Sequence, residues 1–206
     1  MKARAMTSVG LGALVAFSGL QPAGASPTDI VISELMYHPE DAAPVEFLEL
    51  ANRGDSNEDL SDWCLTTGID FCFPAGTSIA PGAHLVVTDD LAGFAAVYGT
   101  DVVPAGEYAG GLSNGGETVE LVDAGGLVID SVTYDDGAPW AATPDGDGPS
   151  LEVIDLDADN DDATNWAASI APAGHTVGAT NSLDGVTLPA VTEVDANPFR
   201  PNPNQS

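Results

Sequence analysis

Basic residues are almost absent from this chain. Its 206 residues include 32 Asp and Glu but only 4 Lys and Arg, a formal net charge of −28. We expect Lys2 and Arg4 to be removed with an N-terminal segment, which leaves a net charge of −30. Such a surface repels nucleic-acid phosphates and anionic membranes, and it attracts divalent cations or basic partners weakly. The simplest interpretation is a solvated acidic surface on an exported protein.

Cysteine is nearly absent too, and only Cys64 and Cys72 occur. Their spacing does not fit a CxxC redox motif. They lie on two short apolar segments, LSDWCL and FCF, joined by a turn that contains Gly68. Antiparallel pairing of these segments can bring the two thiols to disulfide distance, and an oxidising compartment favours the bond. The sequence therefore predicts a disulfide, with two buried thiols as the alternative.

Signatures of catalysis are lacking. There is no HExxH, no GxSxG and no phosphate-binding loop. His38, His84 and His175 are dispersed, so a zinc site would require the fold to bring them together. With 32 acidic residues, any carboxylate pair for glycoside cleavage is uninformative. We expect no enzyme, and the alternative is a secreted hydrolase that uses a carboxylate pair.

Long apolar runs are missing except near the N-terminus. Met1–Ala25 has a basic start, the apolar stretch Val9–Leu20 and the small-residue ending Ala23-Gly24-Ala25. This pattern predicts a signal peptide that is cleaved between Ala25 and Ser26, with an uncleaved anchor as the alternative. After cleavage we expect no membrane insertion. The protein is then secreted, at the cell surface or periplasmic.

Short β-strands separated by turns are what the chain does contain. The segments Glu117–Asp123 and Leu127–Tyr134 alternate around Ala124-Gly125-Gly126, a strong hairpin signal. Leu91–Tyr98 is the one plausible helical turn. The pattern predicts an all-β fold, a sandwich or barrel. The other expected strands are Ile30–Met36, Val45–Leu50, Leu60–Leu65, Phe71–Phe73, His84–Thr88 and Leu151–Leu156.

Several motifs follow one another in a recognisable order. They are ISELMYHP, VEFLELAN, LSDWCL, FPAGTSIAPGAHLVVTDD, LSNGGETVELVDAGGLVIDSVTY and APWAATPDGDGPSLEVIDLDADNDDATNW. In this order they resemble the lamin-tail domain family, over residues 28–182. The MYHP and PDGDGPSLE forms are similar to its exported bacterial branch. The resemblance implies an immunoglobulin-like β-sandwich of short antiparallel strands, without the coiled-coil rod that makes lamins filamentous.

The functional implication of this resemblance is a non-enzymatic module. Bacterial members look like domains that bind, adhere to or position a protein or glycan at the cell surface. The Pro/Asn-rich segment 183–206 is either a linker or the start of a truncated C-terminal sorting module.

Four alternating acids, Asp155, Asp157, Asp159 and Asp161, resemble the first half of a calcium loop. The central Gly and the closing Glu of such a loop are missing at the required positions. We therefore expect an acidic turn and no cofactor, with Ca²⁺ as the alternative, and a calcium-dependent binding module as the corresponding function.

Glutamates and tryptophans on the expected strands have two interpretations each. Glu34, Glu46 and Glu49 are expected to be strand-face or loop-anchoring carboxylates. Trp63, Trp140 and Trp166 are expected to pack the core of a sandwich, with a sugar-stacking platform as the alternative.

Overall fold

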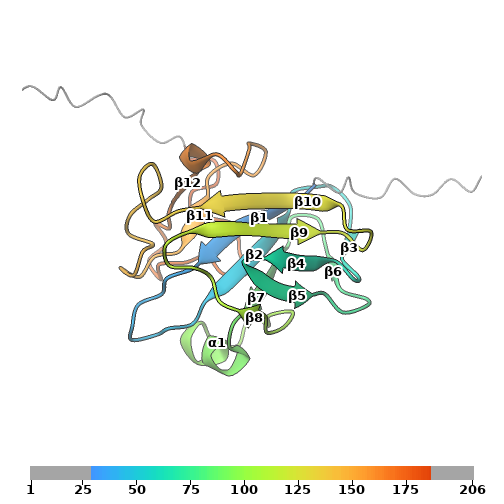
Figure 1. The fold of residues 1–206 in the computed structure, drawn as a ribbon, viewed down its shortest axis with the longest axis horizontal. Helices are drawn as coiled ribbons and strands as arrows, with labels where there is room; N and C mark the ends of the chain where they lie inside the picture. Colours follow the sequence, from blue (N-terminus) through green and yellow to red (C-terminus); the bar gives the residue numbers. More distant parts are fainter. Residues whose placement is uncertain (1–28, 187–206) are drawn as a thin grey trace, which may run out of the picture.

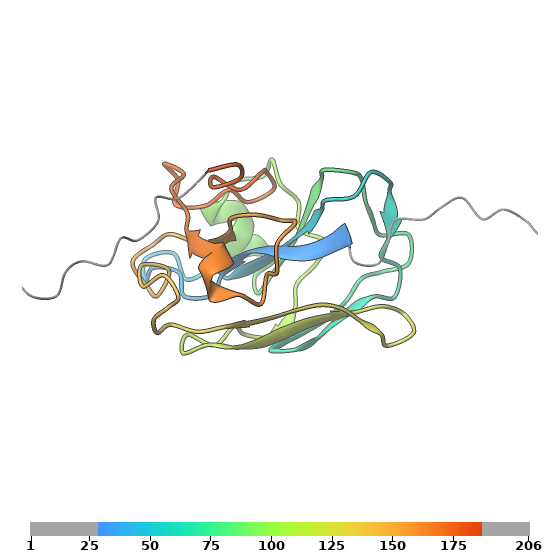
Figure 2. The same ribbon diagram turned by 90° about the horizontal axis from the view of Figure 1, so that it is seen from above.

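Two five-stranded antiparallel sheets face each other in the computed structural model, which describes residues 29–186 (Figures 1 and 2). In spatial order the first sheet contains β12 (Trp166–Ala168), β11 (Leu151–Val153), β1 (Ile30–Met36), β2 (Phe47–Asn52) and β7 (His84–Thr88). The second contains β10 (Val128–Tyr134), β9 (Glu117–Val122), β4 (Cys64–Thr67), β5 (Ile69–Cys72) and β8 (Ala109–Gly110). The predicted all-β immunoglobulin-like sandwich is confirmed.

Three smaller elements complete the fold. Helix α1 (Leu91–Val97) begins after Asp90, whose side chain accepts from the backbone N–H groups of Ala92 and Gly93. A two-stranded ribbon pairs β3 (Glu58–Asp59) with β6 (Ser78–Ile79), and a 3₁₀ turn covers Ala163–Asn165. The predicted signal peptide 1–25, its cleavage site at Ala25 and Ser26, and most of the 183–206 segment lie outside the described residues.

Most of the expected strands are present, and several boundaries differ. The segment expected as a strand from Leu60 begins as β4 only at Cys64, because Trp63 N–H donates to Leu60 O in a turn. In that turn Asp62 has a φ of 63°. Likewise β11 ends at Val153, because Ile154 N–H donates to Asn165 O rather than to a partner strand.

The main core fills the space between the two sheets. Leu48 and Leu50 of β2 point into it, together with Val119 and Leu121 of β9. In β9 the buried residues alternate with half-exposed ones, as expected for a sheet with one face in solvent. The large buried aromatic side chains of the main core are Tyr37, Trp63, Phe73, Tyr108, Tyr134, Trp140 and Trp166.

The first sheet is buried on both faces. Its outer face carries a second, smaller core that includes Met36, Phe47 and Phe94. Figure 2 shows α1 and the C-terminal segment on this side, away from the second sheet. We call residues 169–186 the strap. Cover on both faces explains why every residue of β1 and of β2 is buried.

Both seams between the sheets are partly closed by hydrogen bonds. At one seam the Asp130 carboxylate on β10 accepts from the backbone N–H of Ile32 on β1, 2.6 Å away. At the other, the chain from Ala105 to Tyr108 runs along β7 before β8 pairs with β5. Addition of a partner strand at these two seams is therefore disfavoured.

Candidate functional site

Three glutamates lie side by side on the outer face of the first sheet. Glu34 on β1 is paired in register with Glu152 on β11 and with Glu49 on β2. None of the three has any exposed surface. We call them the glutamate row. Burial of a carboxylate reduces the stability of the fold unless the group is paired or hydrogen-bonded. The partners of the row therefore decide its role.

The strap supplies most of those partners, and each glutamate accepts one strap backbone N–H. Thr176 N donates to Glu34 Oε1 (2.9 Å), Gly178 N to Glu49 Oε2 (2.5 Å) and Ser182 N to Glu152 Oε2 (2.8 Å). The Thr176 hydroxyl lies 3.1 Å from Glu34 and 3.0 Å from Glu152. The row therefore anchors the strap to the sheet.

Side chains of the sheet and of one loop add further contacts. His84 Nδ1 lies 2.7 Å from Glu49 Oε1 in a buried pair. Ser150 Oγ donates to Glu34 Oε1 over 2.6 Å. Burial and, second to it, the nearby Glu49 charge raise the pKa of Glu34 to about 8, against the opposing effect of hydrogen bonds from Ser150 and Thr176. Glu34 is therefore largely protonated at neutral pH.

A groove of about 490 Å³ opens beside the strap. Its walls come from four segments: the loop after β1, the end of α1, the loop before β11 and the first half of the strap. The Tyr98 ring meets the His175 ring edge-on at 4.9 Å, and the Tyr98 hydroxyl donates to Val45 O. Burial lowers the pKa of His175, so its ring is neutral at neutral pH.

The loops on one side of this groove are held together by His38 and Asp145. His38 Nδ1 lies 2.5 Å from Asp145 Oδ1, and Gly146 N–H donates to His38 O. The MYHP and PDGDG segments, which are more than 100 residues apart in the sequence, therefore meet at one end of the sandwich.

The chain is similar to one known protein family. A model of the Lamin Tail Domain family matches residues 23–136, more than half of the chain. The chain belongs to the lamin-tail domain family. A search of curated proteins finds no match. In this lamin-tail domain the strands β11 and β12 and the strap lie beyond the matched residues, yet β11 pairs directly with β1.

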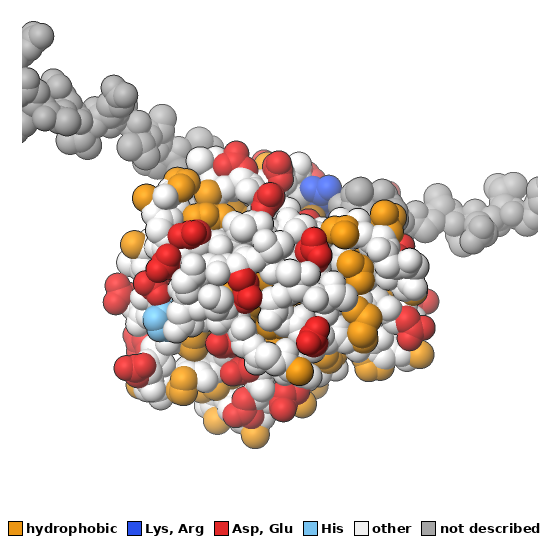
Figure 3. All heavy atoms as spheres, in the orientation of Figure 1, with side chains coloured by type: hydrophobic (Ala, Val, Ile, Leu, Met, Phe, Trp, Pro, Cys, Tyr) orange, Lys and Arg blue, Asp and Glu red, His pale blue; other side chains and the backbone are white. Residues whose placement is uncertain are grey.

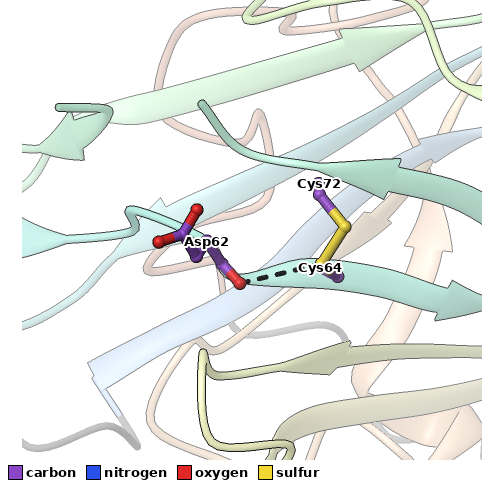
Figure 4. Close-up of a disulfide and its surroundings, with 3 residues drawn as sticks. All are labelled: Asp62, Cys64 and Cys72. Atoms are coloured by element: carbon purple, nitrogen blue, oxygen red, sulfur yellow. Dashed lines mark hydrogen bonds between the residues drawn. A yellow bond between two sulfur atoms is a disulfide. The ribbon is translucent and has the colours of Figure 1, made fainter. Parts of the chain in front are cut away.

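The lamin-tail domain contains the predicted disulfide. Cys64 on β4 and Cys72 on β5 are directly opposite in register and joined, with 4.1 Å between their Cα atoms. Figure 4 shows the bond beside the backbone carbonyl of Asp62, to which Cys64 Sγ lies 3.7 Å away. Cys72 is exposed and Cys64 half-buried, so the bond cross-links the outer face of the second sheet.

The four aspartates considered as calcium ligands form turns in this domain. Asp155 and Asp159 each accept the backbone N–H two residues later, from Asp157 and Asp161. Asp161 also accepts from Thr133 N on β10. Among residues 29–186 no three His, Cys, Asp or Glu side chains are grouped so that they could hold a metal ion. The absence of a cofactor stays a prediction, and calcium binding stays its alternative.

The remaining candidate residues have structural surroundings. Trp63, Trp140 and Trp166 are all buried in the main core, so they offer no exposed platform for a sugar. The Glu46 carboxylate accepts from Tyr108 Oη and from Leu112 N, as a loop-anchoring residue does. Sequence reasoning missed Glu152, although its place between the buried Leu151 and Val153 matches that of Glu34 beside Leu35.

Proposed function

We propose that this chain is an exported, non-enzymatic lamin-tail module that binds, adheres to or positions a protein or glycan at the bacterial cell surface. The observation that supports it best is the use of the buried carboxylates. Glu34, Glu49 and Glu152 are each engaged by strap backbone, so the acidic groups most suited to catalysis by their burial hold a loop instead.

A carboxylate-pair hydrolase is the less supported candidate. Such an enzyme needs two carboxylates held at a fixed separation around an accessible bond. Two acids, Glu40 and Asp147, do line the groove. Within residues 29–186, however, neither carboxylate makes a hydrogen bond that would fix its position. Carboxylates without such bonds suit charge recognition better than acid–base catalysis.

Export is supported by two observations. The Cys64–Cys72 disulfide is typical of an oxidising compartment. The N-terminal sequence Met1–Ala25 supplies the predicted export signal. No helix in the part of the chain that the structure describes is long and apolar enough to cross a membrane.

The test has two parts. The full chain is expressed in a bacterium, and the exported fraction is sequenced from its N-terminus. We expect a mature chain that begins at Ser26. That mature protein, fluorescently labelled, is then titrated onto intact bacterial cells and screened for turnover of polysaccharides. Saturable binding that unlabelled protein competes away, without turnover, is expected. Turnover abolished by a single carboxylate substitution would refute the proposal.

A further inference from the structure

The groove beside the strap is a feature that the anchoring role of the glutamate row leaves unexplained. Several of its wall residues have restricted conformations. Pro39, Pro149 and Pro172 come from three different segments, and Tyr98 is fixed by its hydrogen bond to Val45 and by its ring contact with Phe47 at 5.2 Å. Binding into preformed walls loses little conformational entropy, so this groove is well suited to hold a ligand.

Two carboxylates give the groove its charge. The Glu40 side chain lies against Gly148, so close that a Cβ on Gly148 would come within 2.7 Å of Glu40 Oε1. Asp147 precedes that glycine and lines the same groove. Glu40 therefore reaches across from the loop after β1 to the loop that carries Asp147. Both residues are exposed.

No positive charge offsets these two carboxylates within the groove. Arg53 is the one Lys or Arg among residues 29–186, and it does not line the groove. Its guanidinium donates to the backbone carbonyl of Leu156. His175, which does line the groove, is neutral at neutral pH. Figure 3 shows the same imbalance on one face of the molecule, where many acidic side chains are scattered and a single Lys/Arg patch lies near the upper edge.

The apolar part of the groove limits which cations fit. Met36, Ala43, Val97 and the Tyr98 ring provide surface for an aliphatic stem, and the carboxylates stand beside it. Lys and Arg side chains combine these two properties, because they bury a methylene stem and keep the charged head beside acids or water.

We infer that this groove binds a Lys or Arg side chain on an exposed segment of a partner protein. The inference rests on the proposed binding function and specifies the partner's chemistry. Phosphate-bearing and other anionic ligands are repelled by Glu40 and Asp147. A glycan would gain little stacking stabilisation in this groove, since the three tryptophans, whose rings stack best on sugars, are buried in the main core.

The experiment is an NMR titration of the ¹⁵N-labelled mature chain, residues 26–206, at about 150 mM salt, where charges beyond about 8 Å are screened. The probe is a decapeptide of alternating Lys and Pro, and its control replaces every Lys with Gln. We expect shifts confined to amides around the groove, such as Gly148, Ala173 and Gly174. No shift, or equal shifts over the whole acidic surface, would overturn the inference.

Matched variants separate the groove from the overall charge. The variant E40Q/D147N removes two charges from the groove and should weaken peptide binding about tenfold, as expected for two partly exposed ion pairs. The control D55N/D70N removes two charges from exposed acids that do not line the groove and should change the affinity less than about twofold. Equal weakening by both variants would show attraction to net charge alone.

Two further measurements identify the occupant. Ala173→Trp places a large ring at an exposed position of the groove wall, and it should abolish peptide binding while the melting temperature is retained. Cadaverine, a free diamine, should bind far more weakly than the peptide, and equal binding would overturn the assignment to a protein segment.

If the E40Q/D147N protein still binds cells like wild type, the groove inference fails while the binding function stands. If wild type binds no cells, the proposed function itself fails.

Discussion

Glu34 and Glu152 face each other on neighbouring antiparallel strands, and the hydroxyl of Thr176 lies within 3.1 Å of both carboxylates. Two buried acids that contact the same hydroxyl repel each other when both are ionised. The strap relieves this cost by supplying hydrogen-bond donors, while Glu34 retains its proton at neutral pH. The carboxylates of this sheet are therefore parts of an attachment, and stability depends on that attachment.

Removal of the bridging hydroxyl tests the attachment. Thr176→Val keeps the shape of the side chain but leaves the acceptors on Glu34 and Glu152 with one donor fewer. We expect a loss of about 1–3 kcal/mol in the free energy of unfolding, measured by urea titration. Thr118→Val is the matched control, because that hydroxyl is exposed and pairs only with Thr133. An equal loss in both variants would mean that the Thr176 hydroxyl contributes no more to stability than an exposed hydroxyl does.

The raised pKa of Glu34 predicts a pH-dependent stability. The unfolded chain releases this proton near pH 4.5, whereas the folded protein holds it until about pH 8. Between these values the folded state binds more protons, so the contribution of Glu34 to stability falls as pH rises. Glu34→Gln removes this dependence.

This dependence is read from melting temperatures between pH 5 and 8.5. The melting temperature of the Glu34→Gln variant minus that of wild type should increase as pH rises. Asp70→Asn, at an exposed position of β5, is the control and should show a difference that stays constant. A constant difference for Glu34→Gln as well would contradict burial of a neutral Glu34.

The disulfide closes a small loop, with eight residues of sequence separation between Cys64 and Cys72. In the chain-entropy account a loop of this size stabilises by about 2–3 kcal/mol. The variant C64S/C72S should lose this amount in urea unfolding. A reducing agent should lower the stability of wild type to that of the variant and leave the variant unchanged. Two alkylatable thiols in native, exported protein would disprove the bond.

The acidic run Asp155–Asp161 predicts little response to calcium. Asp155 and Asp159 already accept backbone N–H groups within their own turns, and Asp161 accepts one from β10. We expect Ca²⁺ to shift the melting temperature no more than Mg²⁺ at equal concentration, since both screen the surface charge alike. A shift specific to Ca²⁺ that Asp157→Asn abolishes would instead establish a calcium site.

The sequence predicts the sandwich well because its strands alternate or end at clear turns. The hairpin around Gly125 and the strands at Ile30 and His84 are examples. Adjacent apolar residues such as Phe47 and Leu48 do not alternate, and the structure explains them. Leu48 packs into the main core, and Phe47 packs under α1 and the strap. The sequence pattern did not predict that the outer face of this sheet is also covered.

The candidate site is less visible in the sequence. Glu34 and Glu49 are expected as strand-face or loop-anchoring carboxylates, but the strap that they hold lacks periodicity and is distant in the chain. The groove likewise joins Tyr98, His175 and the loops around Glu40 and Asp147, which only the tertiary fold brings together. Local patterning carries no information on such contacts.

Hydrogen exchange of the strap amides tests most directly whether the buried carboxylates are anchors. Thr176, Gly178 and Ser182 each donate a backbone N–H to one member of the glutamate row. We expect slow exchange at these three amides in wild type, and faster exchange at Gly178 in Glu49→Ala while core amides such as Leu121 stay protected. Exchange at the rate of an unstructured chain at all three amides in wild type would contradict the account.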